Sequence, residues 1–165
     1  MEGHVSRFHE EQHFHDVLMG LLVLAMLFVV FVTTVAVVFS RPNDALLLAI
    51  APVVVVLVAA LISLSHLDVD VTDSGVTIAF RHLWPTRRIS FGEIVGLEVK
   101  HYRPLIDYGG WGVRLGPAGW AYTTGGDVGV KIRLRKGLPV LIGSRHPEEL
   151  EAAIRAGVER QPPRP

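Results

Sequence analysis

The stretch VLMGLLVLAMLFVVFVTTVAVVF, residues 17–39, contains no charged residue and sets the organisation of the whole chain. A helix of this length measures about 35 Å, enough to cross a hydrocarbon core of about 30 Å. A second uncharged run, ALLLAIAPVVVVLVAALISL, covers residues 45–64 and contains Pro52, which membrane helices tolerate. Both runs are too long for ordinary core helices. The sequence therefore predicts two membrane-spanning helices, within a segment of residues 17–64.

The connector between the two runs is SRPND, residues 40–44. A connector this short predicts an antiparallel helical hairpin, with both ends of the chain on the same side of the membrane. The arginines that flank the runs on the side of the termini are Arg7, Arg81, Arg87 and Arg88, against Arg41 in the connector. The positive-inside pattern then predicts a plasma (inner) membrane protein with both termini in the cytoplasm.

A cleaved signal peptide is the alternative interpretation of the first run. The run is longer than the apolar core of a signal peptide, and the residues before it are acidic rather than basic. Residues 1–16 are therefore predicted to be a polar acidic tail that precedes the first span.

The pattern after residue 64 changes from continuous to alternating hydrophobicity, as in HLDVDVT at 66–72 and VTIAFR at 76–81. The clearest hairpin pattern is VGVKIRLRKGLPVLIGS at 128–144. About seven short strands with frequent turn signals predict a sandwich or barrel. HPEELEAAIRAGVER at 146–160 then has the period of an amphipathic helix, with Pro147 near its start. Residues 65–160 are thus predicted to be a mainly-β domain with one C-terminal helix, and 161–165 a disordered tail.

This order of elements resembles the bacterial pleckstrin-homology-like (PH-like) domains that an N-terminal pair of membrane helices anchors. The segments that carry the resemblance are the two apolar runs, the DSG turn, RRISFGEIVGLEV, YGGWGVR and IGSRHPEELEAAI. The resemblance implies a PH-like roll and a family of uncharacterised function, with no catalytic activity. Many eukaryotic PH domains bind phosphoinositides through a basic loop between the first two strands. Here the corresponding turn, residues 73–75, is short and acidic, which argues against that route.

HEEQH at residues 9–13 matches the H-E-x-x-H pattern of zinc hydrolases. On a helix, His9 and His13 would lie one turn apart and hold zinc, and Glu10 would act as general base. A zinc hydrolase also needs a third ligand and a dry cavity, and a short polar tail supplies neither. The motif is therefore interpreted as part of a solvated tail, with a weak metal site at His9 and His13 and a membrane zinc hydrolase as alternatives.

Basic and aromatic residues supply the remaining candidate binding sites. Trp84 beside Arg87 and Arg88 suits a membrane interface, although a turn packed on the barrel rim gives the same pattern. Alternation places Lys131, Arg133 and Arg135 on one face of a strand. This face would bind anionic headgroups or an acidic partner, or it is an outer face that water solvates. Tyr108 and Trp111, among glycines, would line a groove for a peptide or lipid, or fill a small core.

Composition excludes several classes of function. The absence of cysteine excludes disulfides, thiol catalysis and cysteine-bound metals, and the balance of 16 basic and 16 acidic residues gives no sign of a nucleic-acid partner. The sequence therefore predicts a non-enzymatic module without a cofactor, integral to the lipid bilayer, that binds anionic lipids or a protein partner. Self-association and a role as a structural subunit of a larger membrane complex are left open.

Overall fold

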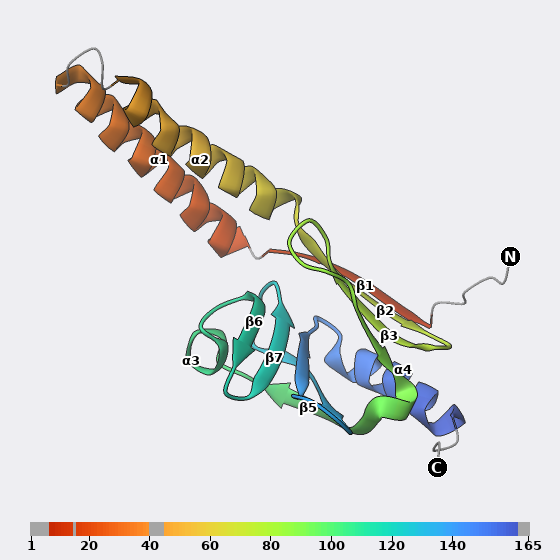
Figure 1. Ribbon diagram of the computed structural model, residues 1–165. Coiled ribbons are helices and arrows are strands. Elements are labelled where there is room, and N and C mark those ends of the chain that lie inside the picture. Colours follow the sequence, from red (N-terminus) through yellow and green to blue (C-terminus); the bar gives the residue numbers. More distant parts are fainter. Residues whose placement is uncertain (1–6, 15, 40–44, 162–165) are drawn as a thin grey trace, which may run out of the picture. The chain divides into compact units, whose positions relative to one another are not determined.

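The computed structural model of the chain describes residues 7–14, 16–39 and 45–161, which form two compact units. The first unit, residues 14–65, contains helices α1 (Asp16–Phe39) and α2 (Ala45–Leu64), which pack against each other (Figure 1). Their bounds agree with the two apolar runs to within one residue, and Pro52 lies inside α2.

One helix among the described residues is long and apolar enough to cross a membrane. It is α1, whose stretch Gly20–Val37 has no part buried inside the protein. The described apolar stretch of α2, Pro52–Leu64, is shorter than a span. A large apolar surface without a protein covering is costly in water, and this supports membrane association of the first unit.

The second unit contains all the described strands, arranged in two sheets. Sheet A is antiparallel, in the order β1-β2-β3-β4. Its strands are β1 (Phe8–His13), β2 (His66–Thr72), β3 (Gly75–Phe80) and β4 (Arg87–Ser90). The prediction that residues 1–16 form a polar tail is therefore wrong for residues 8–13. These residues add an edge strand to the sheet by pairing with β2.

Sheet B has five strands in the order β5-β8-β9-β7-β6, and only β7 and β9 pair in parallel. Its strands are β5 (Ile94–His101), β6 (Gly112–Gly116), β7 (Gly119–Thr123), β8 (Val128–Leu134) and β9 (Val140–Gly143). A 3-10 turn (Phe91–Glu93) connects the two sheets, and a short helix, α3 (Pro104–Tyr108), follows β5. The described residues thus form nine strands rather than about seven.

The main core contains the inward side chains of both sheets and of α4 (Pro147–Arg160). The alternation predicted for β2 and β3 is confirmed, because Leu67, Val69, Val71, Val76, Ile78 and Phe80 are all buried. Helix α4 contacts strands of both sheets and the 3-10 turn between them, and it buries Leu150 and Ile154 (Figure 1). The predicted C-terminal helix is confirmed, with Pro147 in its first turn.

A close contact between Gly157 of α4 and Phe91 of the 3-10 turn fixes how α4 packs. A Cβ atom added to Gly157 would overlap three atoms of the Phe91 ring, which is 2 % exposed and has little room to move. The helix therefore needs glycine here, although alanine is the better helix former by about 1 kcal/mol.

We expect Gly157→Ala to lower the free energy of unfolding by about 1–2 kcal/mol, because overpacking costs about 1–3 kcal/mol and exceeds the gain in helix propensity. Urea unfolding of the purified chain in detergent, followed by tryptophan fluorescence, measures the change. The control is the same substitution in a Phe91→Leu background, where a smaller neighbour should reduce the cost. A stabilised Gly157→Ala protein would contradict the packing described here.

Candidate functional site

The HEEQH motif lies on β1, so its side chains alternate between the two faces of sheet A. Glu10 and Gln12 point inward and are buried, whereas His9, Glu11 and His13 are exposed on the outer face. Four residues of strand span about 13 Å, compared with about 6 Å between neighbours on a helix. The strand therefore separates His9 from His13 and turns Glu10 away from both. The zinc-hydrolase interpretation, which needs a helix, loses its structural basis.

The inward side chains of β1 make hydrogen bonds to residues at or just after the C-terminal ends of β7 and β9 in sheet B. Gln12 donates to the carbonyl oxygen of Gly143 (2.8 Å) and accepts from the hydroxyl of Thr124 (3.0 Å). Glu10 accepts from the hydroxyl of Ser144 (2.6 Å) and from the backbone N–H of Arg145 (2.8 Å). These bonds satisfy polar groups that would otherwise be buried without partners, and they fix β1 to both sheets.

A cluster of imidazole and carboxylate groups, which we call the histidine cluster, lies where β1 ends and β2 begins. It consists of Glu11, His13 and His66, whose possible ligand atoms all lie within 4.8 Å of one another. The Nε2 atoms of His13 and His66 are 3.6 Å and 3.9 Å from Oε1 of Glu11. His13 and His66 are paired across the two strands, and their ring centroids are 5.6 Å apart.

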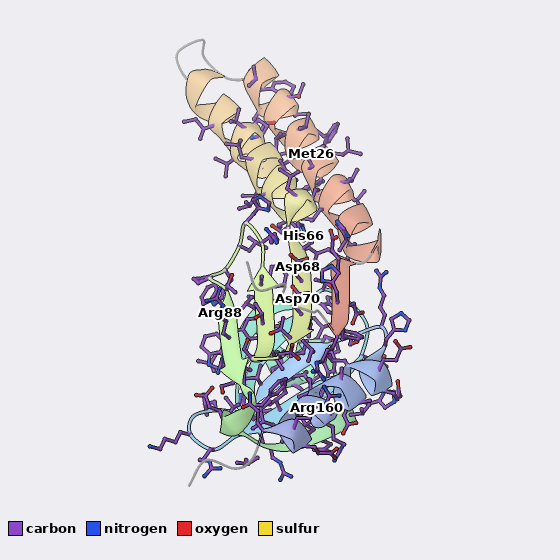
Figure 2. All side chains as sticks on the ribbon, turned by 90° about the vertical axis from the view of Figure 1, so that its right-hand side faces the viewer. Met26, His66, Asp68, Asp70, Arg88 and Arg160 are labelled. Carbon is purple, nitrogen blue, oxygen red and sulfur yellow. The ribbon has the colours of Figure 1, made fainter. Side chains whose placement is uncertain are left out.

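Neighbouring charges on the same face surround the histidine cluster. Asp68 lies directly opposite Glu11 in the strand register, and its Oδ1 is 3.7 Å from Nε2 of His66. Arg81 donates to the other oxygen of Asp68 (2.5 Å), and this hydrogen bond raises the pKa of Arg81. Figure 2 shows His66 and Asp68 following each other along β2, with Asp70 next.

A half-open pocket of about 230 Å³ adjoins these charges on the outer face of sheet A. Its lining residues are Asp68, Asp70, Thr77, Ala79, Phe80, Arg81, Trp84 and Thr86. Among the predicted site residues only Trp84 takes part in it. The Trp84 side chain is 48 % exposed, and its ring lies 6.2 Å from that of Trp120 in sheet B. Trp84, in the connection between β3 and β4, thus lies next to a side chain of sheet B and borders this pocket.

The predicted basic residues fall on different faces. Arg87 and Arg88 belong to β4, where Arg88 is exposed opposite Thr77 on the outer face of sheet A and Arg87 is half-buried (Figure 2). Lys131 and Arg133 lie on the outer face of sheet B, in β8. Arg135 lies in the turn after β8 and is also exposed. The structure thus does not gather the arginines of β4 with those of β8.

The outer face of sheet B carries a second, small core beneath α3. Tyr102 and Tyr108 are buried there with Ala121 and Leu141, and burial raises the pKa of Tyr102 to about 12. A half-open groove of about 240 Å³ runs beside them, lined by Lys100, Tyr102, Ile106, Asp107, Tyr108, Pro117 and Ala118. Tyr108 therefore both fills a core and lines a groove.

Trp111 does not line that groove. Its indole N–H donates to the carbonyl oxygen of Gly126 at 3.2 Å, and its side chain is half-buried. Of the two aromatic residues proposed from the glycine-rich stretch, only Tyr108 thus lies at a concave surface.

Sequence reasoning missed Glu11 and His66 as members of a cluster, and Gln12 as a buried residue. The signal that could have found them is alternation within residues 8–13, which matches the alternation within 66–71. Pairing those two segments would have predicted the strand register and its outer row of polar residues.

We expect Gln12→Ala to lower the free energy of unfolding by about 1–3 kcal/mol, because it leaves the Gly143 carbonyl and the Thr124 hydroxyl without a partner in a buried place. Thermal or urea unfolding in detergent measures this. Gln161→Ala is the matched control, since the Gln161 amide makes only a long, exposed bond of 3.5 Å to the carbonyl oxygen of Asp73. Equal effects of the two substitutions would show that β1 is not held through Gln12.

Known proteins offer no guide to this site. No protein-family model, no curated protein and no solved structure matches the chain. The features that bear on function are therefore the two outer faces of the β unit and the apolar helices.

Proposed function

We propose that the chain is a non-enzymatic, membrane-anchored module that binds anionic lipid headgroups at the plasma (inner) membrane. In this proposal α1 and α2 both cross the membrane as a helical hairpin. The β unit and both termini then lie in the cytoplasm.

The observation that carries the anchor proposal is the pairing of β1 with β2. Phe14 and His15 alone separate β1 from α1, and Ser65 alone separates α2 from β2. Because His13 and His66 are neighbours in the register, the chain leaves and re-enters sheet A at nearly the same place. A chain that starts and ends at one place on one side of a membrane crosses it an even number of times. Helix α1 is long and apolar enough to cross the membrane, so the second crossing requires α2, whose whole sequence is uncharged.

Lipid headgroups are the ligand that the outer face of sheet B fits best. The strand register places Lys131 and Arg133 on that face together with Lys100 and Arg114, against the single acid Glu98 among the strand residues described there. Cations on one face attract anionic headgroups, each contributing about 1 kcal/mol near a charged surface.

Helix α3 adds an apolar component to that face. Leu105 and Ile106 are 69 % and 71 % exposed, and Arg103 next to them is exposed as well. Exposed large apolar side chains next to basic ones are typical of surfaces that insert at the headgroup boundary of a bilayer. A protein partner with an acidic, apolar surface is the competing ligand.

We also propose that the β unit is a PH-like roll. Two sheets closed by a C-terminal amphipathic helix support it. The extra strand β1, which comes from the segment before the first apolar helix, is a departure from a roll of about seven strands.

Cysteine labelling tests the anchor, because the chain has no cysteine of its own. We expect single cysteines at Asn43→Cys, in the connector, and at Lys136→Cys, in the exposed β8–β9 turn, to react from opposite sides of the membrane. A membrane-impermeant maleimide applied to intact cells should label only the first, and both should react after lysis. Labelling of both cysteines from one side would contradict the two-span hairpin.

Lipid binding is tested with the full chain reconstituted in vesicles. An environment-sensitive dye on Ile106→Cys should shift its emission to the blue when phosphatidylglycerol is added to phosphatidylcholine, and high salt should reverse the shift because it screens charge. Lys131→Glu with Arg133→Glu should abolish the shift.

Arg88→Glu on the outer face of sheet A is the control and should leave the shift unchanged. An emission independent of anionic lipid and of salt would exclude the headgroup proposal. The protein partner would then be the better explanation of the basic face.

A further inference from the structure

We propose that Glu11, His13 and His66 form a binding site for a divalent transition-metal ion. This site goes beyond the proposed lipid-binding function and does not depend on it. It also differs from the zinc hydrolase that the HEEQH motif suggested, because it uses Glu11 rather than Glu10 and takes its second histidine from β2.

The geometry of the histidine cluster is close to that of a coordinated ion. Zinc binds imidazole nitrogen and carboxylate oxygen at about 2.0–2.2 Å, so two ligand atoms of a tetrahedral site lie about 3.4 Å apart. Nε2 of His13 and Nε2 of His66 lie 3.6 Å and 3.9 Å from Oε1 of Glu11. The ligand atoms of all three residues lie within 4.8 Å of one another, so side-chain shifts of about 1 Å bring them to bonding distance without any change in the strands.

The backbone supports these positions. His13 and His66 face each other across the β1–β2 pair, and Glu11 lies two residues before His13 on the same face. The three side chains thus project from one rigid, hydrogen-bonded ladder. A site on paired strands is held more precisely than a site on a loop.

Local charge also favours a cation. Glu11 lies directly opposite Asp68, and like charges in that position destabilise a strand pair. Arg81 forms an ion pair with Asp68, whereas the ion-pair distances of Glu11 in the described part of the chain are to the two imidazoles, with Arg81 acting on it at longer range. A bound dication relieves this repulsion. Asp68, whose Oδ1 lies 3.7 Å from the same Nε2 atom of His66, adds a second carboxylate beside the ion.

The ligand set indicates the class of metal. Two imidazoles with one carboxylate suit zinc, nickel, copper or iron, and they disfavour magnesium and calcium, which prefer oxygen ligands. Three protein ligands leave a fourth position for water or for a group from a partner. The exposed side chains of His13 and Glu11, at 63 % and 48 %, leave that position accessible.

A metal at this site would clamp β1 to β2. β1 is an edge strand, and its last residue lies where the chain turns toward the first apolar helix. A bond through the ion between His13 and His66 adds a crosslink to that end of the ladder. Metal binding therefore couples to the docking of β1 on the β unit.

The test uses the full chain in detergent, purified with a tag that contains no histidine. Isothermal titration calorimetry with Zn²⁺ should show saturable binding of one ion, and Co²⁺ should give the visible absorption of a nitrogen- and oxygen-ligated ion. His13→Ala and His66→Ala should each weaken binding by more than about tenfold. Zinc should also slow amide hydrogen exchange in β1, and His66→Ala should remove that effect.

His9→Ala and His101→Ala are the matched controls and should keep wild-type affinity. His9 lies on the same strand and face, but its Nδ1 is 2.7 Å from Oδ1 of Asp70 instead. Unfolding in the presence of EDTA checks the variants, and His13→Ala is the decisive one because its side chain is largely exposed.

Three results would overturn the proposal. They are no saturable Zn²⁺ binding, full binding by a folded His13→Ala protein, and equal losses in His9→Ala and His13→Ala, which would indicate adventitious binding by exposed histidines. Failure of this site would leave the lipid and topology experiments unaffected, because none of their variants touches the cluster.

Discussion

The pairing of β1 with β2 is the constraint on which the rest of this protein depends. It joins a segment that precedes the first apolar helix to one that follows the second, so that His9 and Asp70, 61 residues apart, are in contact. Both apolar helices lie in sequence between these two paired strands. The β unit is therefore connected covalently to the helices at two points, after β1 and before β2.

Buried polar contacts explain why β1 belongs to the fold and does not fray from its edge. As an edge strand, β1 makes backbone hydrogen bonds only to β2, and the backbone groups on its other edge face away from the sheet. Glu10 and Gln12 add four side-chain hydrogen bonds. Three of them reach residues at the end of β9 or just after it, 131 to 135 residues away in sequence, and the fourth reaches Thr124 after β7. An unpaired carboxylate or amide in that place would be costly, so the contacts also disfavour other registers.

The two outer faces of the β unit have different chemistry. Sheet A presents alternating imidazoles and carboxylates, including the histidine cluster, and a polar pocket next to Arg81 and Trp84. Sheet B presents cations around α3, together with exposed Leu105 and Ile106. The first face suits a metal ion and the second suits a charged surface with an apolar layer. The two proposed binding roles use residues of different sheets and therefore do not compete.

The sequence by itself determined those features that one segment decides alone. The bounds of α1 and α2 follow from two uncharged apolar runs. The inward residues of β2 and β3 and the helix from Pro147 follow from hydrophobic periodicity. Both signals are local. Only the tertiary structure decided what HEEQH does. In isolation the segment fits a helix, a tail or a strand equally well. Its conformation depends on hydrogen bonds to a strand that lies beyond two apolar helices, and no local pattern encodes a partner so distant in sequence.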